Sequence, residues 1–252
     1  MRPKNLQKKN IRMVLQYDGT CYQGWQRQKE APTVQAILED RLHMMTGERI
    51  TVIGSGRTDG GVHALHQVCH FLSHTKIDPL SIKKGLNALI PSDIYIKAAD
   101  YVPLDFHARY SAKSKTYEYR ILNREEPDPF LRLFSWHLPT QLEKDVMRQC
   151  LSALSGRHDF SSFRSSGSGN TNPVREMIKA EIHTSQDGLL RFVFEADGFL
   201  RHMVRNIVGT IVDAGRGKTG FNAFMEIFTA RDRRLAGLKA PPQGLFLVMV
   251  RY

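Results

Sequence analysis

A single carboxylate in a glycine-rich loop is the first place where this sequence could do chemistry. Asp59 lies in GSGRTDGGVH, residues 54–63, where glycines flank it on both sides and Arg57 precedes it by two positions. Glycine lets a substrate come close to the backbone, and a neighbouring arginine favours the ionised carboxylate through charge pairing. An ionised, positioned carboxylate can serve as a nucleophile or a general base. The alternative is structural, because Asp-Gly between two strands is also a strong hairpin signal.

Four histidines, at positions 63, 66, 70 and 74, raise the question of a metal site. On a helix such spacing would bring them to one face, where they could share a metal ion. The apolar segment from Gln67 to Leu72 indicates a strand instead, and a strand directs successive side chains to opposite faces. We therefore expect no metal site here.

Three further segments carry aromatic or cationic side chains that suit RNA. Residues 17–28 interleave aromatics with glutamines and an arginine, which indicates either base stacking or a strand followed by a partly buried loop. Tyr117 and Tyr119 alternate on a predicted strand, where they stack a base or pack in the protein. Arg201 and Arg205 lie one turn apart near a predicted helix start, where they face solvent or bind a carboxylate or phosphate.

The overall charge favours a polyanionic partner. The 252 residues include 36 Lys+Arg against 25 Asp+Glu, a net charge of +11, and phosphates supply the matching charge. The alternative is a protein that is basic for solubility alone. Hydrophobic residues make up 41% of the chain, which is enough for a sizeable core. The longest apolar run is far short of the ~18 residues of a membrane span. Residues 1–10 carry no secretory signal, and the three scattered cysteines indicate a reducing cytoplasm.

Hydrophobic periodicity and turn signals predict the same order of elements twice. The first half has strands at 11–17, 50–53, 66–72 and 94–98, with helices that begin after Thr33 and Asp78. The second half has strands at 117–122, 177–183, 190–196 and 245–250, a helix with a Thr140/Glu143 capping box, and helices at 199–214 and 221–228.

Each half therefore reads β-α-β-β-α-β, the split βαβ arrangement. The predicted class is α+β, with two pseudo-duplicated ferredoxin-like halves that have antiparallel sheets and a cleft between them for a ligand. We place the first domain, with the Asp59 loop, at residues 1–105 and the second at residues 106–252.

Taken together, the motifs resemble one family over nearly the whole chain, tRNA pseudouridine synthase A. The matching motifs are YDGT-x-Y-x-GWQ-x-Q at 17–28, GRTD-x-GVHA at 56–64, FHAR at 106–109, K-x-Y-x-Y at 115–119, DFSSF at 159–163, HMVRNIVG at 202–209 and GLFLV at 244–248. The order of GRTD-x-GVHA with the other motifs makes the resemblance highly specific. One departure is Gly60, where the family usually has alanine.

The resemblance implies an isomerase that converts uridine to pseudouridine at positions 38, 39 and 40 of the tRNA anticodon stem-loop. It implies that Asp59 is the catalytic residue and that Tyr117 lies at the target base. It also implies that Arg205 pairs with the catalytic aspartate. Arg57 is then a supporting residue that contacts RNA. The family works as a homodimer without a metal or an organic cofactor. The alternative function is a non-catalytic tRNA-binding protein or chaperone, which would share the charge and the aromatics but would not need Asp59.

Overall fold

The structure, a computed structural model, describes residues 7–165 and 172–252. The chain forms two compact units. The first extends to Lys113 and also takes in Leu247–Tyr252, and the second comprises Ser114–Phe246. The domain boundary expected between residues 105 and 106 stays a prediction, as does the cleft.

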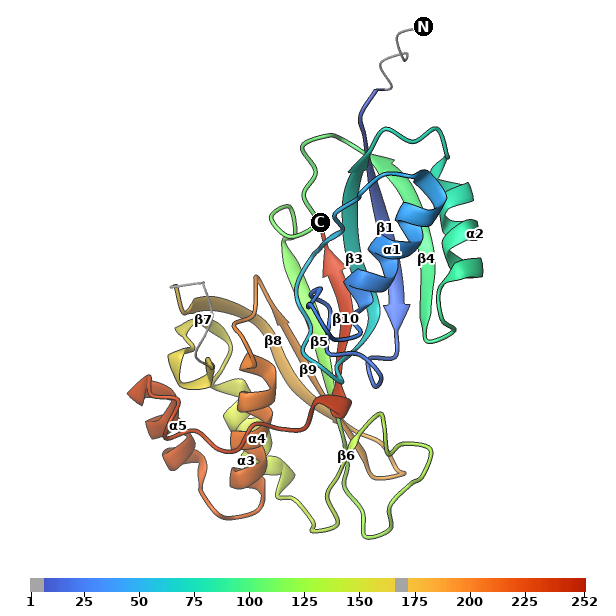
Figure 1. The fold of residues 1–252 in the computed structure, drawn as a ribbon. Helices are drawn as coiled ribbons and strands as arrows, with labels where there is room; N and C mark the ends of the chain where they lie inside the picture. The colour runs from blue at the N-terminus through green and yellow to red at the C-terminus, as the bar shows by residue number, and fades with distance from the viewer. Residues whose placement is uncertain (1–6, 166–171) are drawn as a thin grey trace, which may run out of the picture. The chain divides into compact units, whose positions relative to one another are not determined.

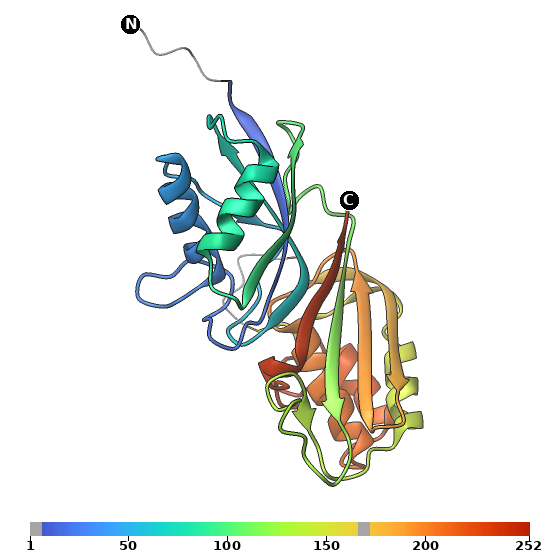
Figure 2. The ribbon, with the colours of Figure 1, turned by 90° about the vertical axis from the view of Figure 1, so that its right-hand side faces the viewer.

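The first unit has the predicted order of elements. These are β1 (Lys9–Tyr17), α1 (Val34–Thr46), β2 (Ile53–Gly54), β3 (His63–Ser73), α2 (Pro79–Leu89) and β4 (Ile94–Val102). Strand β1 lies between β3 and β4 and is antiparallel to both, while the short β2 pairs with β3. Both helices cover the same face of these strands (Figures 1 and 2).

The helices of this unit begin and end where the sequence signals predict. The Thr33 side chain accepts a hydrogen bond from the Ala36 N–H, and Gly47 ends α1 in the left-handed conformation. Asp78 caps α2 by accepting from the Ser81 N–H, one residue before the proline at the first helical position.

The second half of the chain repeats the order with two short strands and one helix added, and its last strand belongs to the first unit from Leu247 onward. Its elements are β5 (Ser114–Leu122), β6 (Trp136–His137), α3 (Lys144–Ser152), β7 (Gly156–Asp159), a 3-10 turn (Ser161–Phe163), β8 (Val174–Thr184), β9 (Leu189–Ala196), α4 (Met203–Gly215), α5 (Phe221–Ala230) and a 3-10 turn (Pro242–Gly244), before β10 (Leu245–Arg251) ends the chain. Strand β9 lies between β5 and β8, antiparallel to both. The α+β class with two β-α-β-β-α-β halves is confirmed.

Two predictions about helix starts in this unit are wrong. The Thr140/Glu143 capping box does not form, because Glu143 is itself the residue before α3 and its side chain makes no cap hydrogen bond. The Glu143 N–H, which the box would use, instead donates to the Gly215 carbonyl oxygen at 2.8 Å. Helix α4 begins at Met203 rather than near 199, because His202 takes a left-handed conformation with φ 62°. Arg201 therefore precedes the helix.

The helices of the second unit pack on one another beside its strands (Figure 1). The apolar side of α4 is buried as the 3.6-residue period predicts, at Met203, Val204, Ile207, Val208, Ile211 and Val212. Across residues 7–165 and 172–252, no helix has the length and apolar character needed to cross a membrane.

Candidate active site

The loop that carries Asp59 is not the tight hairpin that an Asp-Gly pair suggests. Gly54 at the end of β2 pairs with Cys69 in the middle of β3, so the connection between them is much longer than a two-residue hairpin turn. Within it, the Val62 N–H donates to the Asp59 carbonyl oxygen at 3.2 Å, and Gly61 takes φ 75°. This is a type II turn with Asp59 as its first residue, because that turn requires a positive φ at its third position.

The segment after β1 supports this loop from behind, backbone against backbone. The Trp25 N–H donates to the Thr58 carbonyl oxygen at 3.0 Å, and the Gly61 N–H donates to the Tyr22 carbonyl oxygen at 3.2 Å. These bonds hold the chain in place on both sides of Asp59. The segments that carry the YDGT and GRTD motifs therefore pack directly against each other.

Two glycines in that supporting segment allow the close approach. A β-carbon at Gly24, which has φ 92°, would stand 2.4 Å from the Thr58 carbonyl oxygen. A β-carbon at Gly19 would stand 2.0 Å from the Val62 carbonyl oxygen. Real β-carbons do not come this close to carbonyl oxygens, so any other residue at either position would push the loop away.

A buried polar network fixes the other side of the loop. The Gln67 amide is fully buried; its Nε2 donates to the Gly56 carbonyl oxygen at 3.0 Å, and its Oε1 accepts from Ser55 Oγ at 2.7 Å. The hydroxyls of Tyr17 and Thr58 hydrogen-bond at 2.8 Å. Burial raises the pKa of Tyr17 to about 12, so this hydroxyl stays neutral at physiological pH.

The hydrogen bonds of this network hold the residues immediately before Asp59 in place. Buried hydrogen bonds of this kind are costly to break, because a buried polar group that loses its protein partner cannot bond to water instead. Asp59 itself is half-buried, one residue beyond the Thr58 anchor. The fold thus holds a carboxylate at the end of a rigidly supported loop, which is the arrangement that positioned acid–base or nucleophilic chemistry requires.

The four predicted site residues come from both units. Arg57 and Asp59 share the loop, but Arg57 is exposed and makes no hydrogen bond or ion pair with any residue that the structure describes. In the second unit, Tyr117 on β5 is 7% exposed and meets the Phe199 ring edge-on at 5.0 Å. Arg205 on α4 is 6% exposed, and its Nε donates to the Ala240 carbonyl oxygen at 2.7 Å.

Comparison with known proteins assigns the chain to a family. The family described as tRNA pseudouridine synthase matches residues 13–111 and 151–252. The chain is similar to tRNA pseudouridine synthase A from Thermoanaerobacter sp. (strain X514), with 44% identity over 97% of this chain and 100% of that protein. It is similar also to the enzyme of that name from Geobacillus sp. (strain WCH70), with 45% identity over 97% of this chain and 98% of the relative. The chain belongs to the tRNA pseudouridine synthase family. It is a member of a family of isomerases.

The aromatic residues near the Asp59 loop are structural. Of the two interpretations of residues 17–28, the structure favours the buried loop, because Tyr17, Tyr22 and Trp25 are all buried. The Trp25 ring packs where Gly54 has no side chain, 2.6 Å from the position of a β-carbon. Arg27 forms ion pairs with Glu39 and Asp40 on α1. These side chains shape the loop and are not presented as a stacking surface.

The histidines of the chain lie on and just after a strand, as predicted. His63, His66 and His70 are all part of β3, and His74 follows its end. Among residues 7–165 and 172–252, no group of three or more histidine, cysteine or acidic side chains is placed to hold a metal ion.

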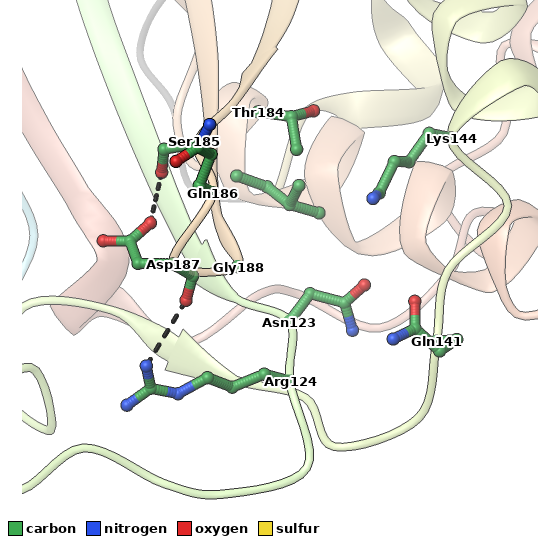
Figure 3. Close-up of a pocket in the computed structure, with 10 residues that line it drawn as sticks. Asn123, Arg124, Gln141, Lys144, Thr184, Ser185, Gln186, Asp187 and Gly188 are labelled. Atoms are coloured by element: carbon green, nitrogen blue, oxygen red, sulfur yellow. Dashed lines mark hydrogen bonds between the residues drawn. The ribbon is translucent and has the colours of Figure 1, made fainter.

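One open pocket in the second unit is lined by none of the four predicted residues. It has a volume of about 380 Å³ and is lined by polar side chains from the ends of β5, β8 and β9 and the start of α3 (Figure 3). Its carboxylate, Asp187, accepts a hydrogen bond from the Ser185 hydroxyl within the same hairpin. Asp187 is thereby tied to the turn of its own hairpin.

Sequence reasoning missed Gln67, which belongs to the site although it touches no predicted catalytic group. The signal was an amide at the start of the largely apolar segment Gln67–Leu72. A buried amide needs partners, and these partners come from the Asp59 loop. Ser55 and Thr58 were visible as loop residues, but their bonds to β3 and β1 depend on the tertiary fold.

Proposed function

We propose that this protein isomerises uridine to pseudouridine in the anticodon stem-loop of tRNA, at positions 38, 39 and 40, with Asp59 as the catalytic carboxylate. The observation that carries the proposal is the supported loop: backbone contacts from residues 22–25 and the Gln67 network both converge on the residues beside Asp59. A loop that only joined two strands would not need anchors on both sides.

The reaction breaks the bond between N1 of uracil and C1′ of ribose and forms a bond between C5 and C1′. The C5 proton leaves and N1 gains a proton, so the product is an isomer of the substrate. Three routes begin with an ionised carboxylate: attack on the ribose, attack on C6 of the uracil, or removal of a ribose proton to give a glycal. Each requires Asp59 to reach a nucleotide that has left its stack, at a cost of a few kcal/mol.

Two residues of the second unit complete the proposal. Tyr117 stacks on the detached uracil and holds it while it turns, and Tyr117 or water accepts the C5 proton. Arg205 pairs with the catalytic carboxylate and keeps it ionised. Support for both roles comes from the family resemblance. A buried guanidinium also requires compensation in its surroundings, which fits a functional rather than a solubilising role for Arg205.

The substrate and setting follow from the same proposal. The net charge of +11 suits tRNA, whose phosphates offset the cost of opening the stem-loop, and Arg57 contacts the RNA from the exposed side of the loop. The protein acts as a cytoplasmic homodimer without a metal or an organic cofactor.

The competing function is a non-catalytic tRNA-binding protein or chaperone. It shares the charge with the proposed enzyme but needs no positioned carboxylate. Incubation of the purified protein with unmodified tRNA transcripts, followed by mapping of pseudouridine, separates the two. We expect pseudouridine at positions 38, 39 and 40 of transcripts that carry uridine there, and none with Asp59→Ala. Tight binding without any pseudouridine would establish the chaperone, and pseudouridine elsewhere would overturn the site assignment.

A further inference from the structure

A tight turn at residues 107–111, in the first unit, presents two side chains to solvent. The Ser111 N–H donates to the His107 carbonyl oxygen at 2.9 Å, and the His107 N–H donates to Ser111 Oγ at 3.1 Å. The N–H groups of Arg109 and Tyr110 both donate to His107 Nδ1 at 3.2 Å. The turn is therefore closed from both ends and through its middle, which fixes its shape before any ligand arrives.

The turn is also anchored to the body of the unit. Ala108 is buried, its N–H donates to His70 Nδ1 on β3 at 3.1 Å, and its carbonyl oxygen accepts from the Tyr252 hydroxyl at 2.7 Å. Burial lowers the pKa of His70 to about 4, with the neighbouring His107 adding to the shift. His70 is therefore neutral at physiological pH, and its Nδ1 is available as the acceptor that this bond needs.

The side chains that the turn presents form an aromatic–cation pair. Tyr110 is 76% exposed, yet its ring stacks on His107 with centroids 4.3 Å apart and planes 29° apart. The Arg109 guanidinium lies 5.6 Å from the centre of the Tyr110 ring. A large aromatic ring that is exposed but already ordered loses little conformational entropy on binding, so it suits a stacking contact.

Further positive charge adjoins this pair. The Lys113 N–H donates to the Arg251 carbonyl oxygen at 2.8 Å, which places two more cationic residues beside the end of the turn. Exposed aromatic rings next to arginine and lysine are the combination that binds unpaired nucleotides, with bases on the rings and phosphates on the cations. A partner that was an apolar protein surface would not match these charges.

We propose that the turn at 107–111 is an RNA-binding subsite of its own, in which Tyr110 stacks on an unpaired base and Arg109 binds the adjoining phosphate. This rests on the proposed function for the identity of the RNA. The register places the subsite away from Asp59: His70 pairs with Arg12 on β1, whereas Thr58, next to Asp59, hydrogen-bonds to Tyr17, which pairs with Ala64 just past the end of the loop. Five residues of strand separate these levels, roughly 17 Å at 3.3 Å per residue. The subsite binds tRNA outside the target nucleotide.

Affinity and chemistry are measured separately to test this inference. Dissociation constants are determined for an unmodified tRNA transcript by filter binding, and conversion rates by single-turnover assay with saturating protein. We expect Tyr110→Ala to weaken binding about 5- to 150-fold, since stacking of a base is worth ~1–3 kcal/mol, with an unchanged single-turnover rate. Tyr110→Phe keeps the ring and should bind like the wild type. Arg109→Gln should reduce the salt dependence of binding by about one phosphate contact.

Leu104→Ala is the matched control, because Leu104 is 61% exposed on the same connection and lacks a stacking partner among the described residues. It should leave tRNA affinity unchanged. Equal affinity of Tyr110→Ala and wild type would overturn the subsite, as would an effect of Tyr110→Ala on subunit association alone. If the wild type binds tRNA but forms no pseudouridine, the proposed function fails while the binding comparison still decides the subsite.

Discussion

Gly24 lies directly against the peptide that joins Thr58 to Asp59. A β-carbon at position 24 would stand 2.4 Å from the Thr58 carbonyl oxygen and 2.9 Å from the Asp59 carbonyl carbon. Because two backbones meet here without a side chain between them, the position of the carboxylate depends on a residue that carries no chemistry.

Gly24→Ala should therefore inactivate the enzyme by moving Asp59. A shift of about 1 Å in a catalytic group can reduce the rate about 100-fold, so we expect at least that loss in the single-turnover rate. Gly47→Ala is the control, since Gly47 also has a positive φ of 72° but no atom lies within 4 Å of the place that a β-carbon would take. Gly47→Ala should show only the backbone strain of about 1–2 kcal/mol in chemical denaturation, with normal activity. Equal activities of the two variants would contradict the role of Gly24 in positioning Asp59.

Gly60→Ala should be tolerated, although Gly60 is adjacent to Asp59. Its φ is not in the left-handed region, and a β-carbon there would meet the Gln23 Oε1 atom at 3.3 Å, the end of a flexible side chain. We expect activity within about threefold of the wild type and a gain of about 0.4–1 kcal/mol in the free energy of unfolding. A large loss of activity would mean that the loop needs glycine here for motion.

Gln67→Leu should disturb the loop through lost hydrogen bonds. The substitution removes the Gln67 hydrogen bonds to Ser55 Oγ and to the Gly56 carbonyl oxygen, and the loss of a buried hydrogen bond costs about 1–3 kcal/mol. We expect lower stability in urea and a clear fall in the single-turnover rate, with tRNA affinity retained. Asn87→Leu is the comparison: its amide bonds both backbone groups of Ile96 in the same unit. It should lower stability alone, and a similar rate loss in both would contradict the positioning role.

His70 should make stability depend on pH in a defined direction. Burial lowers its pKa from 6.5 to about 4, so between these values the unfolded chain binds more protons than the folded one. The free energy of unfolding should therefore fall as pH falls from about 6.5 towards 4. Urea denaturation at pH 7 and pH 5 measures this, with His70→Gln as the reference. The loss on acidification should be smaller in the variant; an equal loss would assign the effect to other groups.

Local signals in the sequence predicted local structure well. Thr33 and Gly47 fixed the ends of α1 because a cap depends on atoms a few residues away. The Thr140/Glu143 box failed because the Glu143 N–H, which a capping box would use, donates to the Gly215 carbonyl oxygen at the end of α4 instead. Helix α4 begins later than predicted because His202 has a positive φ, which could not be predicted from its residue type.

The sequence alone was enough to propose a catalytic residue, but it could not predict how the fold supports that residue. Asp59 could be singled out because a carboxylate among glycines is visible in the sequence alone. The anchors could not, because the bonds from Gln67 to Gly56 and from Trp25 to Thr58 join residues that only the fold brings together. The same long-range packing buried Trp25, which the sequence left open between an RNA contact and a core residue.

The most direct test of the central claim is tritium release from tRNA labelled at C5 of uridine. Asp59→Ala is compared with the wild type and with Asp145→Ala, whose carboxylate is exposed on α3 and pairs only with Arg148 among the described residues. Asp59→Ala should bind tRNA within several-fold of the wild type and release no tritium above background, while Asp145→Ala releases it at the wild-type rate. Substantial release by Asp59→Ala would contradict the assignment of catalysis to this residue.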